Sequence, residues 1–422
     1  MEVNGGRNPY EVLPVDLRRV NGLFQLVEKN IQEKSARDPI EAGFLNALYP
    51  ELFNGGLMRP HIEEAFALRR TRQSFYPTGY ALRNLEFCIN KQANLFLDDY
   101  PAGGYHDPNK WQSSKLFEMM DVYDLVWDMQ YDLQSSMADA YAIYHQLSYL
   151  FSDRLGKDIR VLDNGSSQAL GLKKWLLSGH GFDPIKVFKA PRRDQPIVPS
   201  GMEPDDQIQE IVNDLSGRLP LVSRAIGYDA FPIKAQDQDA HNRVFSHTFP
   251  FSEAINRPDE VKEFWELKSD YEAGIISGSS RVEIIDNQSI YAEDEESMSV
   301  LDSRLPGGKA DLAILSAFLF EQPDARINRI LNNIAKHCEP HSPILIADFI
   351  ERSRQTPATP HGFKFVRGSW WHRPAQFALF MLDSSCLDEP AVEIARFMDR
   401  RGREMWLSDA GRRIFIEGAT RL

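Results

Sequence analysis

The stretch Ile159-Arg-Val-Leu-Asp163-Asn-Gly165-Ser-Ser-Gln-Ala-Leu-Gly171 decides the fold of this chain. Residues 159–163 have the pattern of a buried strand that ends in an acid, and residues 168–177 have the pattern of a helix. Gly165 and the small residues after it let the backbone approach a ligand closely. The start of the helix adds a partial positive charge at the same place. The stretch therefore predicts a strand, a tight turn and a helix, with a ligand site at the turn.

Four further short apolar runs follow along the chain, and helical patterns separate them. The runs cover residues 219–229, 281–286, 310–316 and 343–348. Strands separated by helices indicate an α/β fold, with a mostly parallel sheet and helices on both faces. Such a sheet binds its ligand beyond the carboxyl ends of its strands. That rule selects the turn from Asp163 to Ser167, together with Asp229, Asp286 and Ser316.

The chain is predicted to form two domains. Residues 1–157 read as a helical N-terminal domain, and residues 158–422 as the sheet domain with an insert near residues 183–218. The connection over residues 351–374 is unusually long for a compact domain. It contains Trp370 and Trp371, and we expect it to close over the substrate.

A β-hairpin is expected at the C-terminal end of the sheet domain. Residues 403–407 and 412–417 flank the turn-rich tetrapeptide Ser408-Asp-Ala-Gly411. Two short runs around such a turn are typical of a hairpin.

The composition limits the classes of partner. Lys and Arg number 48 and Asp and Glu 61, so the net charge is −13, which argues against nucleic-acid binding. Three cysteines are too few for a disulfide framework. There is no signal-peptide pattern, and the apolar run over residues 312–320 is far shorter than the roughly 20 residues of a membrane span. We therefore expect a soluble cytoplasmic protein with a small-molecule substrate and no membrane partner, and a homodimer as the assembly to test.

The spacing Asp163-x-Gly165-x-Ser167-x-Ala169 resembles the first motif of class I S-adenosylmethionine (SAM) methyltransferases, acid-x-Gly-x-Gly-x-Gly. Gly165 holds the first glycine position, and Ser167 and Ala169 replace the other two. The resemblance implies a Rossmann-like methyltransferase domain with SAM as cofactor. It also implies that Asp163, Gly165, Ser166 and Ser167 contact that cofactor.

The other strand ends follow the order of the same family. The resemblance implies that Asp229 binds the ribose hydroxyls, that Asp286 and Asn287 hold the adenine amine, and that Ser316 borders the methyl group. The run over residues 185–188 could be taken for the second strand instead, which would favour Asp183 or Asp194. We prefer Asp229 because basic residues, not an acid, follow that run.

Residues from about 155 to 422 also resemble an uncharacterised bacterial family with a predicted methyltransferase fold. Gly165-Ser-Ser-Gln-Ala-Leu170 and Gly227-Tyr-Asp229-Ala-Phe-Pro232 carry this likeness, together with a charged helical insert over residues 256–271. No substrate is established for that family. The likeness therefore adds to the expected fold but not to the expected acceptor.

The reaction expected from these features is methyl transfer to a small molecule. Glu321, just after the fourth strand, and His361 and His372 in the long connection are the candidate general bases. No metal site is expected, because His241 with His247, and His337 with Cys338 and His341, lack metal-ligand spacing. The replaced glycines favour an alternative, a non-catalytic or differently catalytic protein whose helical part binds a partner.

Overall fold

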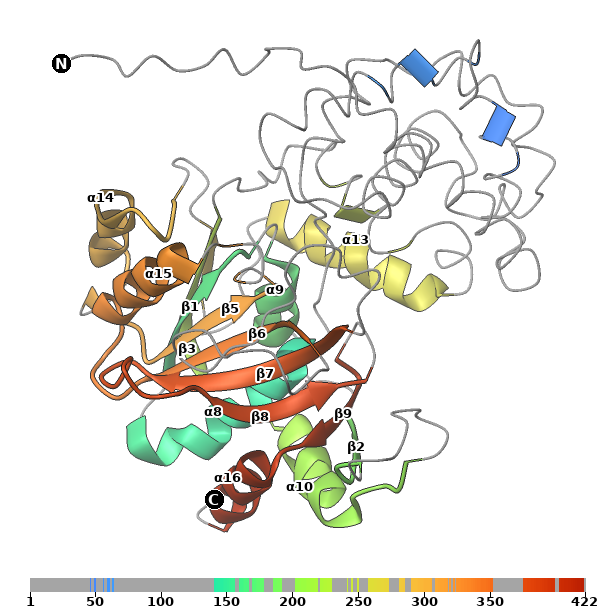
Figure 1. Cartoon of the computed structure of the whole chain (residues 1–422), viewed down its shortest axis with the longest axis vertical. Helices are drawn as coiled ribbons and strands as arrows, with labels where there is room; N and C mark the ends of the chain where they lie inside the picture. The colour runs from blue at the N-terminus through green and yellow to red at the C-terminus, as the bar shows by residue number, and fades with distance from the viewer. Residues whose placement is uncertain are drawn as a thin grey trace. The chain divides into compact units, whose positions relative to one another are not determined.

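The computed structural model of the chain describes residues 140–155, 159–166, 169–177, 185–191, 202–218, 221–229, 257–272, 281–284, 290–305, 308–317, 324–351, 375–398 and 402–420, with isolated positions between 46 and 63, 241 and 249, and 319 and 322. The chain divides into two compact units. One combines Met1–Ser136 with Asp237–Trp265, and the other combines Met137–Gln236 with Glu266–Leu422. All the described strands belong to the second unit (Figure 1).

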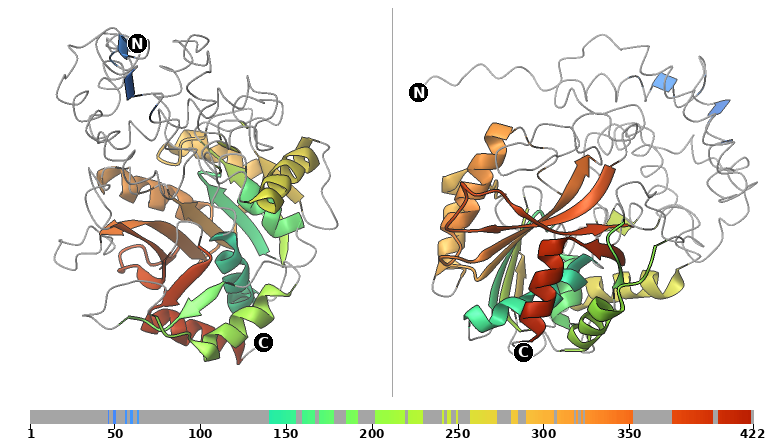
Figure 2. Two further views of the ribbon diagram at one scale, coloured as in Figure 1. Left: turned by 90° about the vertical axis from the view of Figure 1, so that its right-hand side faces the viewer. Right: turned by 60° about the horizontal axis from the view of Figure 1, so that its bottom comes forward.

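The strands of the second unit form one sheet. They are β1 (Ile159–Asn164), β2 (Lys186–Phe188), β3 (Val222–Tyr228), β4 (Arg281–Ile284), β5 (Leu312–Ser316), β6 (Pro343–Glu351), β7 (Ala375–Asp383), β8 (Val392–Phe397) and β9 (Glu404–Leu407). The described helices are α8 (Tyr141–Leu155), α9 (Leu170–Leu177), α10 (Asp206–Ser216), α13 (Pro258–Glu272), α14 (Glu295–Met298), η3 (Ser299–Ser303), α15 (Asp324–Lys336) and α16 (Asp409–Ala419). The sheet has nine strands in the order β2-β9-β8-β7-β6-β5-β1-β3-β4. Figure 2 shows the ribbon from two further directions.

The parallel part of the sheet has the strand order of a Rossmann-like fold. Strands β4, β3, β1, β5 and β6 are parallel to one another. From β1 the chain adds β3 and β4 on one side and then β5 and β6 on the other, so the order reverses between β1 and β5. Beyond β6, strands β7, β8 and β9 run antiparallel in succession. The expected α/β fold with a mostly parallel sheet is confirmed.

The central strands are buried on both faces. On β5, Leu312 and Ile314 pack with α8, α9, α10 and α16, whereas Ala313 and Leu315 pack with α14, η3 and α15. Figure 1 shows α15 and α8 on different sides of the sheet. Strands covered on both faces are uniformly apolar, which is why the short apolar runs could be recognised in the sequence.

Helix α8 is part of the sheet unit. It falls within residues 1–157, which we expected to form a separate helical domain, but Ile143, Tyr144 and Leu147 belong to the same core cluster as Val161 of β1. The two compact units divide at residue 136, before this helix. None of the helices in the described part of the chain is long and apolar enough to cross a membrane.

A buried ion pair joins the starting ends of β1 and β5. The Arg160 guanidinium donates to both carboxylate oxygens of Asp311, at 2.8 and 2.9 Å, and to Glu339 Oε1 at 2.9 Å. These bonds raise the pKa of the Arg160 guanidinium, so it stays charged although it is largely buried. Breaking one side of such a pair leaves an uncompensated buried charge, and the pair therefore fixes the register of these two strands.

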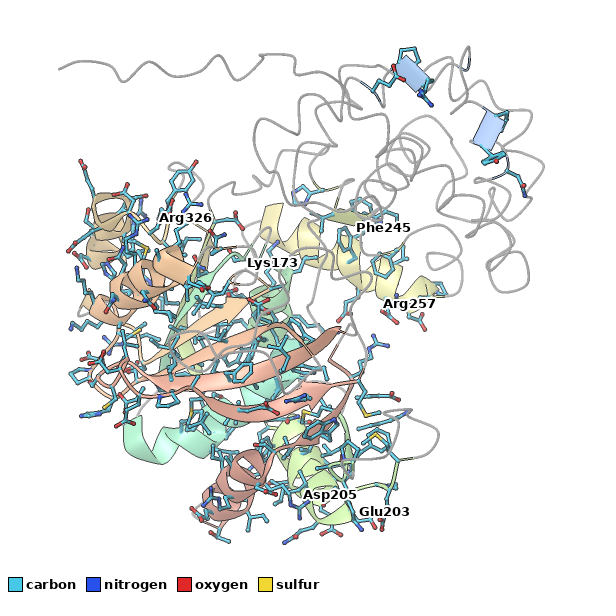
Figure 3. All side chains as sticks on the ribbon, in the orientation of Figure 1. Lys173, Glu203, Asp205, Phe245, Arg257 and Arg326 are labelled. Carbon is cyan, nitrogen blue, oxygen red and sulfur yellow. The ribbon has the colours of Figure 1, made fainter. Side chains whose placement is uncertain are left out.

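Aromatic packing dominates the described residues of the first unit. The Phe245 ring stacks on Trp265 at 5.2 Å between centroids and also contacts Phe249 and Phe264. The guanidinium of Arg257 lies 4.9 Å from the centroid of Phe249. Figure 3 labels Phe245 and Arg257 in this region. Phe264 and Trp265 belong to α13, which overlaps nearly all of the stretch expected as a charged helical insert.

The expected C-terminal hairpin over residues 403–417 is wrong in its second half. Residues Glu404–Leu407 form β9, but Asp409–Ala419 form the helix α16. Ser408 caps that helix, because its Oγ accepts a hydrogen bond from Gly411 N at 3.0 Å. Serine is equally suited to turns and to helix N-caps, so the local sequence did not separate the two. The hairpins are β7–β8 and β8–β9 instead.

Replacing the cap should destabilise the protein measurably. We expect Ser408→Ala to lower the free energy of unfolding by about 1 kcal/mol, because an N–H of the first helical turn loses its acceptor. Urea denaturation of both proteins measures this. Arg413→Ala, an exposed position on the same helix, is the matched control and should change stability by less than about 0.5 kcal/mol. An equal effect of the two substitutions would contradict the cap.

Candidate functional site

The candidate site lies at the carboxyl end of β1. Asp163 pairs in register with Gly227 of β3 on one side and Ile314 of β5 on the other. This is the point at which the strand order reverses, where open α/β sheets bind their ligands. Gly165 and Ser166 directly follow β1, Asp229 follows β3, and Ser316 ends β5. The structure therefore brings these five predicted residues to the same edge of the sheet.

Asp163 is completely buried and is held by a tyrosine from α8. Its Oδ2 accepts a hydrogen bond of 2.5 Å from the Tyr141 hydroxyl. Its other oxygen, Oδ1, has no hydrogen-bond partner among the described residues. A buried polar atom without a partner is uncommon in native proteins and requires an explanation, such as a ligand.

Burial controls the charge of this pair. Removal from water raises the pKa of the Asp163 carboxyl to about 7; the Tyr141 bond acts against this rise, and the charge of Asp229 adds to it. Burial and the Asp163 charge also raise the pKa of the Tyr141 hydroxyl well above its usual value. Tyr141 is therefore a hydrogen-bond donor at all ordinary pH values, whereas Asp163 changes its protonation near neutral pH.

The turn after β1 depends on two glycines. Gly165 has a left-handed backbone with a φ of 77°, and the amides of Gly165 and Ser166 both donate to the carbonyl of Tyr228, at 3.0 and 3.2 Å. A Cβ at Gly227 would lie 2.7 Å from Ser166 Oγ, so the turn can approach β3 only because position 227 has no side chain.

Of the two replacements in the glycine motif, the structure describes Ala169, and this residue keeps a glycine-like backbone. Ala169 has a φ of 53°, which is unusual for a residue with a side chain and costs roughly 1–2 kcal/mol. Its amide donates to Ser166 O at 2.7 Å, and its carbonyl accepts from Lys173 N in the first turn of α9. The loop between β1 and α9 therefore holds a conformation that glycine would adopt without strain.

The end of β5 is tied to the same helix as Asp163. Tyr144 and Ser316 share a hydrogen bond of 3.2 Å between their hydroxyls. Asp348 of β6 is fully buried and accepts from Leu319 N at 2.7 Å, so it secures the backbone after β5. Ser316 remains partly exposed at this edge and is available to a ligand.

Two tyrosines of α8, Tyr141 and Tyr144, were not predicted from the sequence as site residues. They lie three residues apart on α8, and their rings make an edge-to-face contact at 5.1 Å. Both rings are buried, as aromatic residues on the apolar face of a helix usually are. Gly171 distinguishes Tyr141 from an ordinary core residue, because a Cβ at position 171 would lie 2.1 Å from the Tyr141 ring.

The choice of Asp229 over Asp183 and Asp194 is supported by the sheet order. The run that includes Lys186–Phe188 does form a strand, β2, but it pairs with β9 at the far edge of the sheet. Strand β3 is the neighbour of β1 and leads to Asp229. The remaining predicted residues, Ser167, Asp286, Asn287, Glu321, His361 and His372, lie outside the described residues, as do Trp370 and Trp371.

Comparisons with known proteins give distant structural likeness only. No protein-family model matches the chain, and no curated protein matches it. Among solved structures, the rRNA methyltransferase AviRa from Streptomyces viridochromogenes is 12% identical, with a TM-score of 0.28, over 57% of this chain and 84% of its own. The cyclase SpnF is 11% identical, with a TM-score of 0.24, over 56% and 55%. The SAM-dependent methyltransferase SibL is 13% identical, with a TM-score of 0.23, over 83% and 84%.

These scores are too low to carry an argument about function, so the fold is defined by the strand order and by the turn after β1. The chain has a Rossmann-like α/β fold, with a candidate site at the carboxyl end of its central strand.

A substitution at Gly171 should disturb the site through Tyr141. We expect Gly171→Ala to lower the free energy of unfolding by about 1–3 kcal/mol, because the added methyl group displaces the buried ring. Gly217→Ala is the matched control, since the nearest atom to its added Cβ would be 3.8 Å away and its φ of −81° suits alanine. Chemical denaturation should separate the two variants; similar curves would mean that Tyr141 is not seated against α9.

The protonation of Asp163 should appear in the pH dependence of stability. Its pKa is raised from 3.8 to about 7 in the folded state, so the stabilisation from the bound proton is complete below pH 3.8 and is lost as the pH rises through 7. Relative to Asp163→Asn, the wild type should lose on the order of 4 kcal/mol between pH 4 and 8. Chemical denaturation of both proteins across this pH range measures the difference. Parallel profiles of the free energy of unfolding against pH would contradict the raised pKa of Asp163.

The difference between these two proteins isolates Asp163 from other titrating groups. Burial lowers the pKa of His145 to about 4, which destabilises the folded state as the pH falls below 6.5. This effect runs opposite to that of Asp163 but is present in both proteins and cancels in the difference.

Proposed function

We propose that the chain is a SAM-dependent methyltransferase that acts on a small-molecule acceptor. The observation that carries the proposal is the buried Asp163 carboxyl at the point where the strand order reverses. One of its oxygens is bonded to Tyr141, and the other has no partner among the described residues. An acceptor atom held in this way is suited to a donor group of a ligand. The turn at Gly165 and the conformation of Ala169 support the same site.

The chemistry of the residues fits SAM. The cofactor offers hydrogen-bond donors in its amino group and ribose hydroxyls, and it supplies an electrophilic methyl group. The described edge offers acceptors at Asp163 and Asp229, and a hydroxyl at Ser316. The paired amides of Gly165 and Ser166 are already used by Tyr228 O, so this turn shapes the site rather than donating to an anion.

Each cofactor role proposed here comes from the family resemblance. Asp163, Gly165, Ser166 and Ser167 would border the cofactor at the turn, and Asp229 would accept from the ribose. Asp286 and Asn287 would hold the adenine, and Ser316 would lie near the methyl group. Methyl transfer needs an acceptor held in line with the methyl carbon, so positioning does much of the catalytic work.

The acceptor side of the site is part of the same proposal. Glu321, His361 and His372 remain the proposed general bases, and the connection over residues 351–374 the proposed lid. A small-molecule acceptor, rather than a nucleic acid, is favoured by the net charge of −13.

Cofactor binding tests the proposal directly. SAM or its demethylated product should raise the melting temperature, since at 100 times its dissociation constant a ligand adds about 2.7 kcal/mol to the free energy of unfolding. Asp229→Asn should weaken binding by roughly 10- to 100-fold, because hydrogen bonds to a charged group are lost. Isothermal titration calorimetry measures the dissociation constant of the cofactor for the wild type and for Asp229→Asn.

Asp388→Asn is the matched control, because it removes an exposed acid from the β7–β8 connection. It should bind as the wild type does. If neither SAM nor its demethylated product binds at millimolar concentration, the proposed activity is contradicted. The alternative, a related fold used for partner binding or for other chemistry, would then be favoured. Mass spectrometry of the purified protein for bound SAM gives an independent reading.

A further inference from the structure

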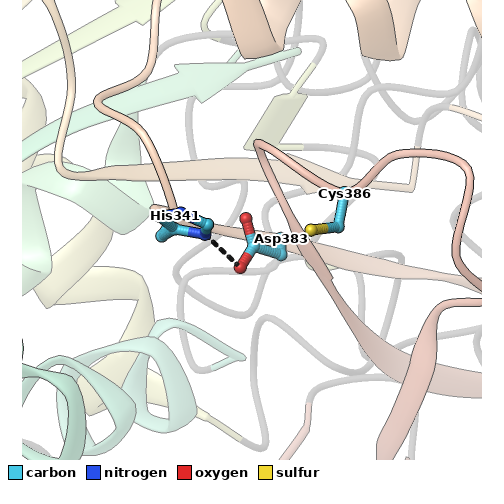
Figure 4. A group of neighbouring side chains, drawn as sticks. All are labelled: His341, Asp383 and Cys386. Atoms are coloured by element: carbon cyan, nitrogen blue, oxygen red, sulfur yellow. Dashed lines mark hydrogen bonds and ion pairs between the residues drawn. The ribbon is translucent and has the colours of Figure 1, made fainter.

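A second group of chemically active side chains lies away from the candidate site. His341, Asp383 and Cys386 each offer one ligand atom, and these three atoms lie within 4.8 Å of one another (Figure 4). His341 lies two residues before the start of β6, whereas Asp383 ends β7 and Cys386 lies in the β7–β8 connection. The imidazole Nδ1 is 3.1 Å from Asp383 Oδ2. From this cluster we infer a zinc-binding site with one nitrogen, one oxygen and one sulfur ligand.

The set of ligands selects the metal. An imidazole, a carboxylate and a thiolate together suit Zn²⁺, whereas Mg²⁺ and Ca²⁺ require oxygen ligands. Tetrahedral zinc with bonds of 2.0–2.3 Å separates its ligand atoms by about 3.4 Å. The three ligand atoms lie within 4.8 Å of one another in the structure. Small side-chain rotations bring them to the tetrahedral separation, because His341 is largely exposed and can turn. Three protein ligands leave a fourth position for water.

The backbone around the cluster is held in place before any metal binds. Ser385 Oγ accepts from His341 N at 2.9 Å, and Ser385 N donates to Asp383 Oδ1 at 2.8 Å. Ser384 Oγ donates to Glu339 O at 2.8 Å and also accepts from Ser342 N. Three of these four bonds join the two connecting segments, and the fourth, from Ser385 N to Oδ1, leaves Asp383 Oδ2 on the side of the imidazole. Partners of this kind orient metal ligands.

The charges around the thiol favour a bound cation. Asp383 and Glu389 place negative charge near Cys386. A bound dication is attracted to these charges and deprotonates the thiol that coordinates it. Zinc would form bonds to sulfur, nitrogen and oxygen and release the thiol proton to solvent.

The position of the cluster separates it from methyl transfer. Pro343, at the start of β6, pairs with Asp383, so the cluster lies at the amino ends of the parallel strands. Asp163 and Ser316 lie at their carboxyl ends. Zinc at this place would fasten the β5–β6 connection to the β7–β8 turn, and it would act on stability rather than on the reaction.

Cobalt and zinc titrations of the full-length, untagged, chelator-treated protein test the site. Co²⁺ should produce a thiolate-to-cobalt charge-transfer band with one equivalent of metal, and Zn²⁺ should displace it. Cys386→Ala should abolish the band, and Asp383→Asn and His341→Gln should each weaken zinc binding at least 10- to 100-fold. Zinc should also raise the melting temperature of the wild type but not that of Cys386→Ala.

Cys338→Ala is the matched control, because Cys338 is a buried cysteine close in sequence to His341. It should keep the band, and so should Cys88→Ala, whose cysteine lies outside the described residues. A band that survives in Cys386→Ala, a band lost in either control, or no band at all would overturn the inference. Circular dichroism of each variant confirms that the fold is retained.

Discussion

The rest of this sheet domain is arranged around a single carboxyl group buried at the end of its central strand. Removing Asp163 from water is unfavourable unless a partner offsets the cost, and Tyr141 supplies that partner from α8. The tyrosine reaches Asp163 only because Gly171 has no side chain. A helix before the sheet, its first strand and the helix that follows are therefore coupled through one hydrogen bond. The free oxygen of the same group marks the site.

Buried carboxyl groups are paired differently at the two ends of the parallel strands. At the amino ends, the Asp311 carboxylate is fully matched by Arg160, with Glu339 at the edge. At the carboxyl end, Asp163 has only the neutral Tyr141 hydroxyl as a partner among the described residues, and burial raises its pKa to about 7. A matched pair stabilises one register, whereas an incompletely matched acid keeps binding capacity for a ligand. Strength of pairing thus distinguishes the structural end of the sheet from its functional end.

Much of the fold could be predicted because the central strands are buried on both faces. The five parallel strands appear in the sequence as short apolar runs, and Asp163 near the end of β1 and Asp229 after β3 mark the ends of two of them. The Ser408-Asp-Ala-Gly411 segment was ambiguous, since a turn and a helix N-cap use the same residues. The pairing of β2 with β9 joins residues more than 200 positions apart, and no local pattern encodes it.

The site was predictable in part for the same reason. Residues that follow the strands could be found by their position, whereas Tyr141 and Tyr144 act from a helix whose apolar pattern indicates only burial. His341 lies 42 residues before Asp383, so their proximity depends on the antiparallel pairing of β6 and β7. Sequence spacing could not reveal it, and the sequence pattern indicated no metal site there.

The replaced glycines of the motif need not mean a lost function. The motif resemblance places glycine at positions 165, 167 and 169, and the chain keeps it only at the first. At position 169 an alanine nevertheless adopts a φ of 53°, although this costs roughly 1–2 kcal/mol. Strain of this size persists only where the surroundings impose it, and it is common where a loop must fit a ligand. The backbone of the turn, rather than its glycine content, is therefore the better guide to what this edge of the sheet can bind.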